Sequence, residues 1–261
     1  MYQDKIILIC DNTLDGIFTA VYDAWRFPAR GTDVEIRTKE PENYELFCRF
    51  MNVRTSEEKA AKVLRTVRRN LGIQTYEALC HAVLADDEEK GTAVFYVLYS
   101  ALGQGRCNAR IMESLADTHV RHVAQLHKKV WNEIHHYFGF VRFQETGTGA
   151  MLSVIAPKHD VLTMLGPHFA NRFPGETWVI YDRKRKKALL HPKGGSCQIR
   201  QGVSLELKPG TELSETGEYE ELWRAFCKSI TIQERKNEKL QKQLMPLRFR
   251  ADMTEFEGVS D

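Results

Sequence analysis

The sequence has no closely spaced cysteines. Its six cysteines stand at positions 10, 48, 80, 107, 197 and 227, with no C-x-x-C pair among them. Structural zinc, iron–sulfur clusters and zinc deaminases all need thiolates held close together. The spacing therefore predicts neither a metal nor a cofactor, and it argues against a disulfide framework. We expect the cysteines to be small buried side chains in a reducing compartment.

Long hydrophobic runs and short catalytic motifs are also missing. The only apolar run near the start is Ile6 to Ile9, which is too short for a signal peptide or a membrane span. Gly16 stands alone rather than in a glycine-rich phosphate loop, and no G-x-S-x-G nucleophile motif occurs. His119 and His122 lack the H-E-x-x-H spacing of a zinc helix, so we interpret them as packed or surface residues. The sequence predicts a cytoplasmic protein without membrane contact and leaves open whether it is an enzyme.

What the chain does contain is enough apolar sequence for a sizeable core. It has 261 residues, of which 43% are hydrophobic. The net charge is only +2, but lysine and arginine collect around residues 54–69, 183–187 and 224–250. Local charge therefore says more about partners than the total does. Gly103, Gln104 and Gly105 indicate a boundary between a mostly helical lobe, residues 1–104, and an α+β lobe, residues 105–261, packed as one unit.

Hydrophobic periodicity predicts a mixed α+β fold, with a small, mainly antiparallel sheet flanked by long helices. The chain opens with a strand, a loop and a helix: residues 5–10 read as a buried strand and residues 14–25 as a helix. Further helices are expected over 44–50, 56–71, 73–84, 92–102, 108–137 and 218–244. After the last of these, Phe249 and Phe256 either dock the tail or leave it loose.

Residues 138–145 form the first candidate site. Alternation along a strand would place Val141 and Phe143 on a core face. The opposite face would then carry Phe140, Arg142 and Gln144. A ring, a guanidinium and a carboxamide are side chains that proteins use on unstacked nucleotides. The alternative is an ordinary half-exposed strand face.

The second candidate is a run of five cations between two expected strands, residues 178–182 and 188–191. The run consists of Arg183, Lys184, Arg185, Lys186 and Lys187. Like charges at one turn repel each other, which favours a solvated tip, and such a tip would release counterions on meeting a phosphate backbone.

His168 and Arg172 are a third candidate, because residues four apart share one face of a helix. Histidine can exchange a proton near neutrality and arginine can hold a phosphate, although both could equally be structural. If the chain is catalytic, His168 and Asp182 are the candidate groups.

The sequence also resembles a known family. The resemblance rests on the run 138–145, on Asp160, Val161 and Leu162, on His168 and Phe169, and on residues 178–182. These are similar to the family of probable DNA metabolism proteins that carries the domain of unknown function 4130. That resemblance implies a bacterial protein encoded beside a radical S-adenosylmethionine (SAM) enzyme. It also implies a link to a uracil-DNA-glycosylase-like protein, because some relatives are fused to such a domain.

Together these features predict a DNA-binding protein of bacterial DNA repair or modification, acting with a radical SAM enzyme and positioning a nucleotide or DNA strand. Two alternatives remain. The chain could be an autonomous glycosylase-like enzyme acting on damaged bases, or a protein–protein adaptor of the radical enzyme without DNA contact.

Overall fold

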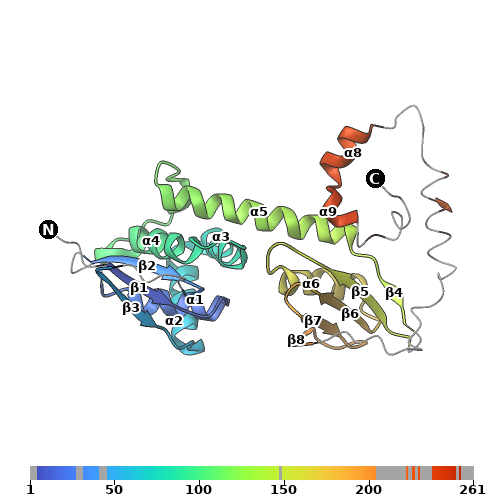
Figure 1. The fold of residues 1–261 in the computed structure, drawn as a ribbon, viewed down its shortest axis with the longest axis horizontal. Helices are drawn as coiled ribbons and strands as arrows, with labels where there is room; N and C mark the ends of the chain where they lie inside the picture. The colour runs from blue at the N-terminus through green and yellow to red at the C-terminus, as the bar shows by residue number, and fades with distance from the viewer. Residues whose placement is uncertain are drawn as a thin grey trace. The chain divides into compact units, whose positions relative to one another are not determined.

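The computed structural model describes residues 5–27, 32–40, 46–146, 149–203, 222, 225–226, 229, 237–250 and 253. The chain divides into two compact units, Met1–Asn132 and Glu133–Asp261. The mixed α+β class is confirmed, and the described residues contain two separate sheets (Figure 1).

The first unit is built on a parallel three-stranded sheet. Its strands β1 (Lys5–Ile9), β2 (Asp33–Arg37) and β3 (Cys48–Asn52) lie in the order β2-β1-β3. The central strand is apolar because helices cover it: Ile7 and Leu8 are both fully buried. The helices are α1 (Leu14–Ala24), α2 (Glu57–Asn70), α3 (Gly72–Leu84), α4 (Lys90–Leu102) and the start of α5 (Thr118–Phe140), with short 3-10 turns at Gly103–Gly105 and Ile111–Glu113.

The connection from β1 to α1 brings the backbone of Gly16 close to the carbonyl group of Asp11. The Thr13 hydroxyl accepts a hydrogen bond from the Gly16 amide at 3.0 Å, which caps the helix. A Cβ atom on Gly16 would lie 2.4 Å from the carbonyl oxygen of Asp11. Glycine is therefore required here for close approach of two backbone segments.

Helices α3 and α5 meet through a pair of histidines. The Nδ1 atoms of His81 and His127 lie 2.9 Å apart, and their rings stack with centroids separated by 4.9 Å. The exposed ring of Trp131 stacks on His81 at 5.8 Å. His81 is only 4% exposed. Burial, together with the neighbouring His127, lowers the pKa of His81 to about 4.

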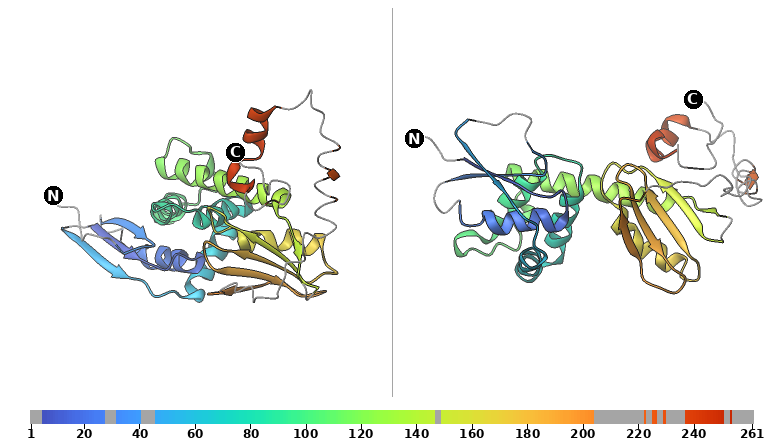
Figure 2. Two further views of the ribbon diagram at one scale, coloured as in Figure 1. Left: turned by 45° about the vertical axis from the view of Figure 1, so that its right-hand side comes forward. Right: turned by 60° about the horizontal axis from the view of Figure 1, so that its bottom comes forward.

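The second unit contains a five-stranded sheet in the order β4-β5-β6-β7-β8 (Figure 2). Its strands are β4 (Gln144–Glu145), β5 (Met151–Ile155), β6 (Trp178–Asp182), β7 (Lys187–His191) and β8 (Gln198–Gln201). Only the β5–β6 pair is parallel, and helix α6 (Leu162–Arg172) makes the crossover between these strands. Helices α8 (Glu238–Leu244) and α9 (Leu247–Arg250) follow later in the chain.

An aromatic cluster forms the core of this unit. Trp178 is fully buried, and its ring stacks on that of His191 with centroids 4.9 Å apart. The ring of Phe143 contacts those of Phe169, Phe173 and Trp178 at centroid separations of 5.5 to 6.0 Å. This packing fixes the connection between α5 and β4 against the sheet.

Several predicted elements differ from the structure. The helix expected over 44–50 is wrong, because residues 48–50 pair with β1 as part of β3. The long helix begins at Thr118 rather than 108, after turns that include Ile111–Glu113. Strand β2 lies in a segment for which no helix or strand was predicted. Most of the helix expected over 218–244 falls outside the described residues, which show α8 at its end.

The boundary between the two compact units falls between residues 132 and 133 of the chain, whereas the sequence indicated a boundary between residues 104 and 105. The difference has a physical reason, because the first half of α5 packs on the preceding helices. Tyr96 of α4 stacks on His119 at 4.7 Å, in addition to the contact between His81 and His127. In the part of the chain that the structure describes, no helix combines the length and apolar character needed to cross a bilayer.

Replacing Gly16 with alanine should destabilise the first unit. Alanine favours helices intrinsically, but its Cβ would meet a backbone carbonyl that cannot move aside, so we expect a loss of about 2 kcal/mol in the free energy of unfolding. The matched control is Gly139→Ala, since a Cβ there meets no atom within 4 Å. Urea titration of both variants measures the difference, and equal stability of the two would contradict the close-packing argument.

The buried side chain of His81 should make stability depend on pH. Because the folded-state pKa of His81 lies below the ordinary 6.5, the unfolded chain takes up the proton first as the pH falls. The contribution of His81 to the free energy of unfolding is thus fully present above about pH 6.5. It is lost as the pH falls toward 4, and the loss for this one group is about 3 kcal/mol. Urea titrations between pH 7 and 4 should show a shallower decline for His81→Phe than for the unchanged protein. Parallel curves would contradict the assignment.

Candidate nucleic-acid interface

The five-cation turn between β6 and β7 is organised by Asp182. This side chain is fully buried. Its Oδ1 accepts hydrogen bonds from the amides of Lys184 and Arg185 at 2.9 and 3.2 Å, and its Oδ2 pairs with the Arg185 guanidinium at 3.0 Å. A carboxylate with so many donors is occupied by the turn itself. The geometry thus gives Asp182, one of the two catalytic candidates, a structural task.

The turn is also tied to the loop over residues 157–160. Arg185 donates to the carbonyl oxygens of Pro157 and Lys158. Lys187 forms an ion pair with Asp160. The Lys184 ammonium adds a longer hydrogen bond to the Lys158 carbonyl oxygen at 3.5 Å, so three of the five cations contact the loop.

Three cations of the turn are exposed, including Lys184, whose contact with the loop lies at the surface. Arg183, Lys184 and Lys186 are exposed, and Lys186 has a left-handed backbone with φ of 51°. The Lys186 carbonyl accepts a hydrogen bond from the amide of Val203 at 3.0 Å. Asp182 and this bond fix the backbone on both sides of the charged residues, so the ammonium and guanidinium groups project from a defined turn.

A second buried carboxylate binds the amide groups of the same loop, whereas Arg185 binds its carbonyl groups. Glu133 of α5 is 1% exposed and accepts hydrogen bonds from the amides of Lys158 and His159 at 3.0 and 2.7 Å. Arg248 of α9 pairs with the Glu133 carboxylate at 3.3 Å. Buried charges are kept when they are paired and hydrogen-bonded in this way.

Phe140, expected on a strand, lies in the last turn of α5. Its ring stacks on His136 at 5.5 Å and contacts Phe249 of α9 at 5.3 Å. Burial and Arg248 lower the pKa of His136. The strand expected over 138–145 is therefore wrong, since α5 extends to Phe140 and only Gln144 and Glu145 join the sheet. The tail docks by Phe249, which is 2% exposed, whereas Phe256 lies outside the described residues.

Arg142 and Gln144 are placed by local contacts. Arg142 donates to the carbonyl oxygens of Gly139 and Val141 at 2.7 and 3.3 Å, so its guanidinium helps to end the helix. Gln144 pairs with Leu152 at the edge of the sheet. Val141 and Phe143 do pack inward, as the alternation predicted.

His168 lies against Phe138 on a different side of α5 from Phe140. The two rings stack with centroids 4.1 Å apart. Positions 138 and 140 point in nearly opposite directions on a helix, so one faces α6 and the other α9. Burial and the nearby Arg172 lower the pKa of His168, and its buried Nε2 atom has no hydrogen-bond partner in the described structure. Arg172 is exposed, with its guanidinium 5.7 Å from the ring centroid of Phe173.

The strand register separates the candidate residues into two groups. Asp182 pairs with Ile155 and Lys187, which places the cationic turn at one end of the sheet. Trp178 pairs with Met151 and His191 at the opposite end, about 13 Å away at the usual rise per residue. Helix α6 returns toward that second end, so Arg172 lies away from the turn. The cations and the ring-bearing residues therefore do not form one group.

Sequence reasoning missed the structural importance of Glu133 and Arg248. A signal for Glu133 was available, because it lies three residues after Val130 and four before Tyr137, on the apolar face of α5. A charge in that position requires partners. Those partners lie 25 or more residues away in sequence, so only the fold identifies them. Across the described segments, no three His, Cys, Asp or Glu side chains are placed to hold a metal ion.

Replacing Asp182 should destabilise the second unit. Asp182→Ala leaves the amides of Lys184 and Arg185 and the Arg185 guanidinium without their acceptor, so we expect a loss of about 2 to 3 kcal/mol in the free energy of unfolding. Asp182→Asn keeps one oxygen for the amides and should lose less. Urea unfolding compares the two, and an alanine variant as stable as the unchanged protein would refute this role.

Comparison with known proteins adds the family. No curated protein matches the sequence. The chain does match the domain of unknown function DUF4130 over residues 88–255, which include all of α4, all of α5 and the entire β4–β8 sheet. This match covers well over half of the chain, and we conclude that the protein belongs to the DUF4130 family.

Proposed function

We propose that this protein binds DNA, with the β6–β7 turn contacting the phosphate backbone. The observation that supports this most directly is the arrangement of the turn. Asp182, Arg185 and Lys187 use their charges to build it, while Arg183, Lys184 and Lys186 are exposed at its surface. A preformed group of exposed cations loses little conformational freedom when it meets a phosphate backbone.

The exposed cations suit backbone contact rather than base reading. Phosphate contacts need positive charge in a defined place but carry no sequence information. The ring expected to stack on a base is engaged elsewhere, since Phe140 packs on His136 and Phe249. The geometry therefore favours binding by charge, with little dependence on base sequence.

A second basic surface lies on α2. Arg65, Arg68 and Arg69 are exposed on this helix, while Lys59 and Lys62 are paired with Asp23 and Glu58 at 2.7 Å each. These pairs reduce the charge that α2 can offer to a phosphate. We therefore assign the main DNA contact to the turn.

The biological setting is a further part of the proposal. The resemblance to probable DNA metabolism proteins supports a role in bacterial DNA repair or modification, with a radical SAM enzyme as the partner. In that setting the chain would supply DNA affinity, and the partner enzyme would supply the chemistry.

Neutralising the exposed cations of the turn should weaken the salt dependence of DNA binding. The variant Arg183→Gln, Lys184→Gln, Lys186→Asn keeps Arg185 and Lys187, and asparagine tolerates the left-handed backbone at position 186. The slope of log K against log salt should fall by about 0.9 for each duplex phosphate that the turn no longer neutralises. Binding of labelled duplex and single-stranded DNA across a salt series measures this slope.

The matched control removes three exposed cations of α5, in the variant Arg121→Gln, Lys128→Gln, Lys129→Gln. The control lowers the net charge equally, so it should change the slope far less if the turn is the contact. An equal fall in both variants would mean that only overall charge matters. An unchanged slope in the turn variant would remove the turn from the interface.

The partner is tested separately by co-expression with the neighbouring radical SAM enzyme. Co-purification that is strengthened by DNA would support the proposed setting. A complex that persists in high salt, from a chain with no DNA affinity, would instead favour a protein–protein adaptor.

A further inference from the structure

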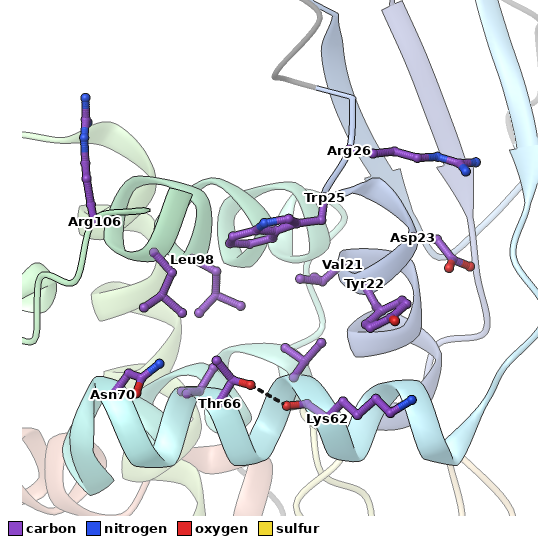
Figure 3. Close-up of a pocket in the computed structure, with 13 residues that line it drawn as sticks. Val21, Tyr22, Asp23, Trp25, Arg26, Lys62, Thr66, Asn70, Leu98 and Arg106 are labelled. Atoms are coloured by element: carbon purple, nitrogen blue, oxygen red, sulfur yellow. Dashed lines mark hydrogen bonds between the residues drawn. The ribbon is translucent and has the colours of Figure 1, made fainter. Parts of the chain in front are cut away.

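The first unit contains a pocket that the proposed DNA contact does not use. It has a volume of about 640 Å³ and lies between α1, α2 and α4 (Figure 3). That volume is within the range of small-molecule sites, roughly 300 to 1,000 Å³. All the residues that line it belong to the first unit.

The floor and walls of the pocket are mostly apolar. Five aliphatic residues line it: Val21, Val63, Val67, Leu98 and Leu102. Trp25 adds an indole ring directly after α1, on the same side as Leu98 (Figure 3). This ring is fixed edge-on against Phe95 and Tyr99, with centroid distances of 6.4 and 5.7 Å. A rigid aromatic wall opposite aliphatic side chains suits a flat ring.

The rim of the pocket carries positive charge. Its one acid, Asp23, is neutralised by Lys59 at 2.7 Å, and Lys62 is paired with Glu58. In the described part of the chain, no acidic side chain pairs with Arg26 or Arg106. These two residues stand at opposite margins (Figure 3), and both are exposed.

We propose that this pocket binds a small flat aromatic molecule that carries one anionic group. The ring would lie in the apolar cavity beside Trp25, and the anion would lie at the rim within reach of Arg26 or Arg106. Thr66 and Asn70 add hydrogen-bonding groups along α2. Both an aromatic carboxylate and a nucleoside monophosphate have this chemistry.

Charge and shape together select this ligand class. An uncharged apolar ligand would leave the excess charge of the rim unused, whereas a multiply charged polar ligand would leave the aliphatic walls without a partner. A guanidinium forms strong charge-assisted hydrogen bonds with carboxylate, phosphate and sulfonate oxygens. Both guanidinium groups point away from the cavity in Figure 3, so either arginine would supply that contact by changing its side-chain rotamer.

A pair of related fluorescent probes tests both halves of the proposal. Anilinonaphthalene sulfonate is an aromatic anion with a flat naphthalene ring, and phenylnaphthylamine has the same rings without the sulfonate. The full-length protein should bind the sulfonate with a stoichiometry of one and more tightly than the neutral probe. Equal affinity for both probes would overturn the assignment of an anion.

Two variants place the probe in the pocket. Thr66→Trp adds a large ring at the lining of the cavity and should weaken sulfonate binding about tenfold or more, as loss of an apolar site does. Its control, Gln125→Trp, adds the same ring at an exposed position of α5. Equal affinities in these two variants would show that the probe binds elsewhere.

Removing the rim charge is the second test, and it does not depend on Thr66→Trp folding. Arg26→Gln with Arg106→Gln should weaken sulfonate binding about tenfold, the loss expected for one charge-assisted hydrogen bond. Binding of the neutral probe should stay within about twofold. The control pair Arg121→Gln with Lys129→Gln should leave both affinities unchanged, and an equal loss there would refute the role of the rim.

Competition then identifies the kind of ligand. Displacement of the bound sulfonate by adenosine monophosphate would indicate a nucleotide, and displacement by indole acetate would indicate an aromatic carboxylate. Failure of both to displace the probe would overturn the proposal. Neither result depends on DNA binding by the β6–β7 turn, because the pocket variants and the turn variant share no residue.

Discussion

Two buried carboxylates hold one loop, and the second unit depends on that arrangement. Glu133 binds the loop over residues 157–160 through two of its amides, and Asp182 positions Arg185 to bind two of its carbonyl oxygens. The loop leads from β5 into α6, so its position determines how the crossover helix lies on the sheet. Each acid would be costly to bury alone: Glu133 is satisfied only when the loop is in place, and Asp182 is satisfied only when the turn that carries Arg185 has formed. Helix, hairpin and loop therefore stabilise one another.

This arrangement also decides what the cationic run can do. Five consecutive positive residues look equivalent in the sequence, but the fold divides them into two kinds. Arg185 and Lys187 are partly buried and paired with Asp182 and Asp160. Arg183, Lys184 and Lys186 are exposed on the backbone that those pairs hold in place. Replacing the whole run would combine a folding defect with a binding defect, whereas replacing the exposed three separates the two effects.

The predictability of each feature follows from how local its cause is. The β1 strand and the starts of α1 and α2 depend on neighbouring residues: the apolar run of residues 6–9 predicted the strand, and in the structure Thr13 and Ser56 cap the two helices. Strand β3 depends on pairing with β1 more than 40 positions earlier in the chain, and local sequence there suggested a helix. The predicted site had the same weakness. Phe140, His168 and Arg183 were grouped by residue type, but α5 turns Phe140 away from His168, and the strand register puts Arg183 at the other end of the sheet.

The pocket of the first unit could not be predicted from any local motif, because it is formed by ordinary core residues from separate helices. Val21, Val67 and Leu98 were predictable as apolar helix positions, yet three helices meeting at their ends leave space among them that their side chains do not fill. The pocket is open to solvent at its rim, so its apolar walls and fixed indole leave apolar surface in contact with water. A ligand that covers this surface would remove it from water, and the positive charge at the rim limits which ligands can do so. The pocket and the cationic turn thus belong to different units and suit different ligands: the pocket suits a flat ring with a single anionic group, and the turn suits a repeating phosphate backbone.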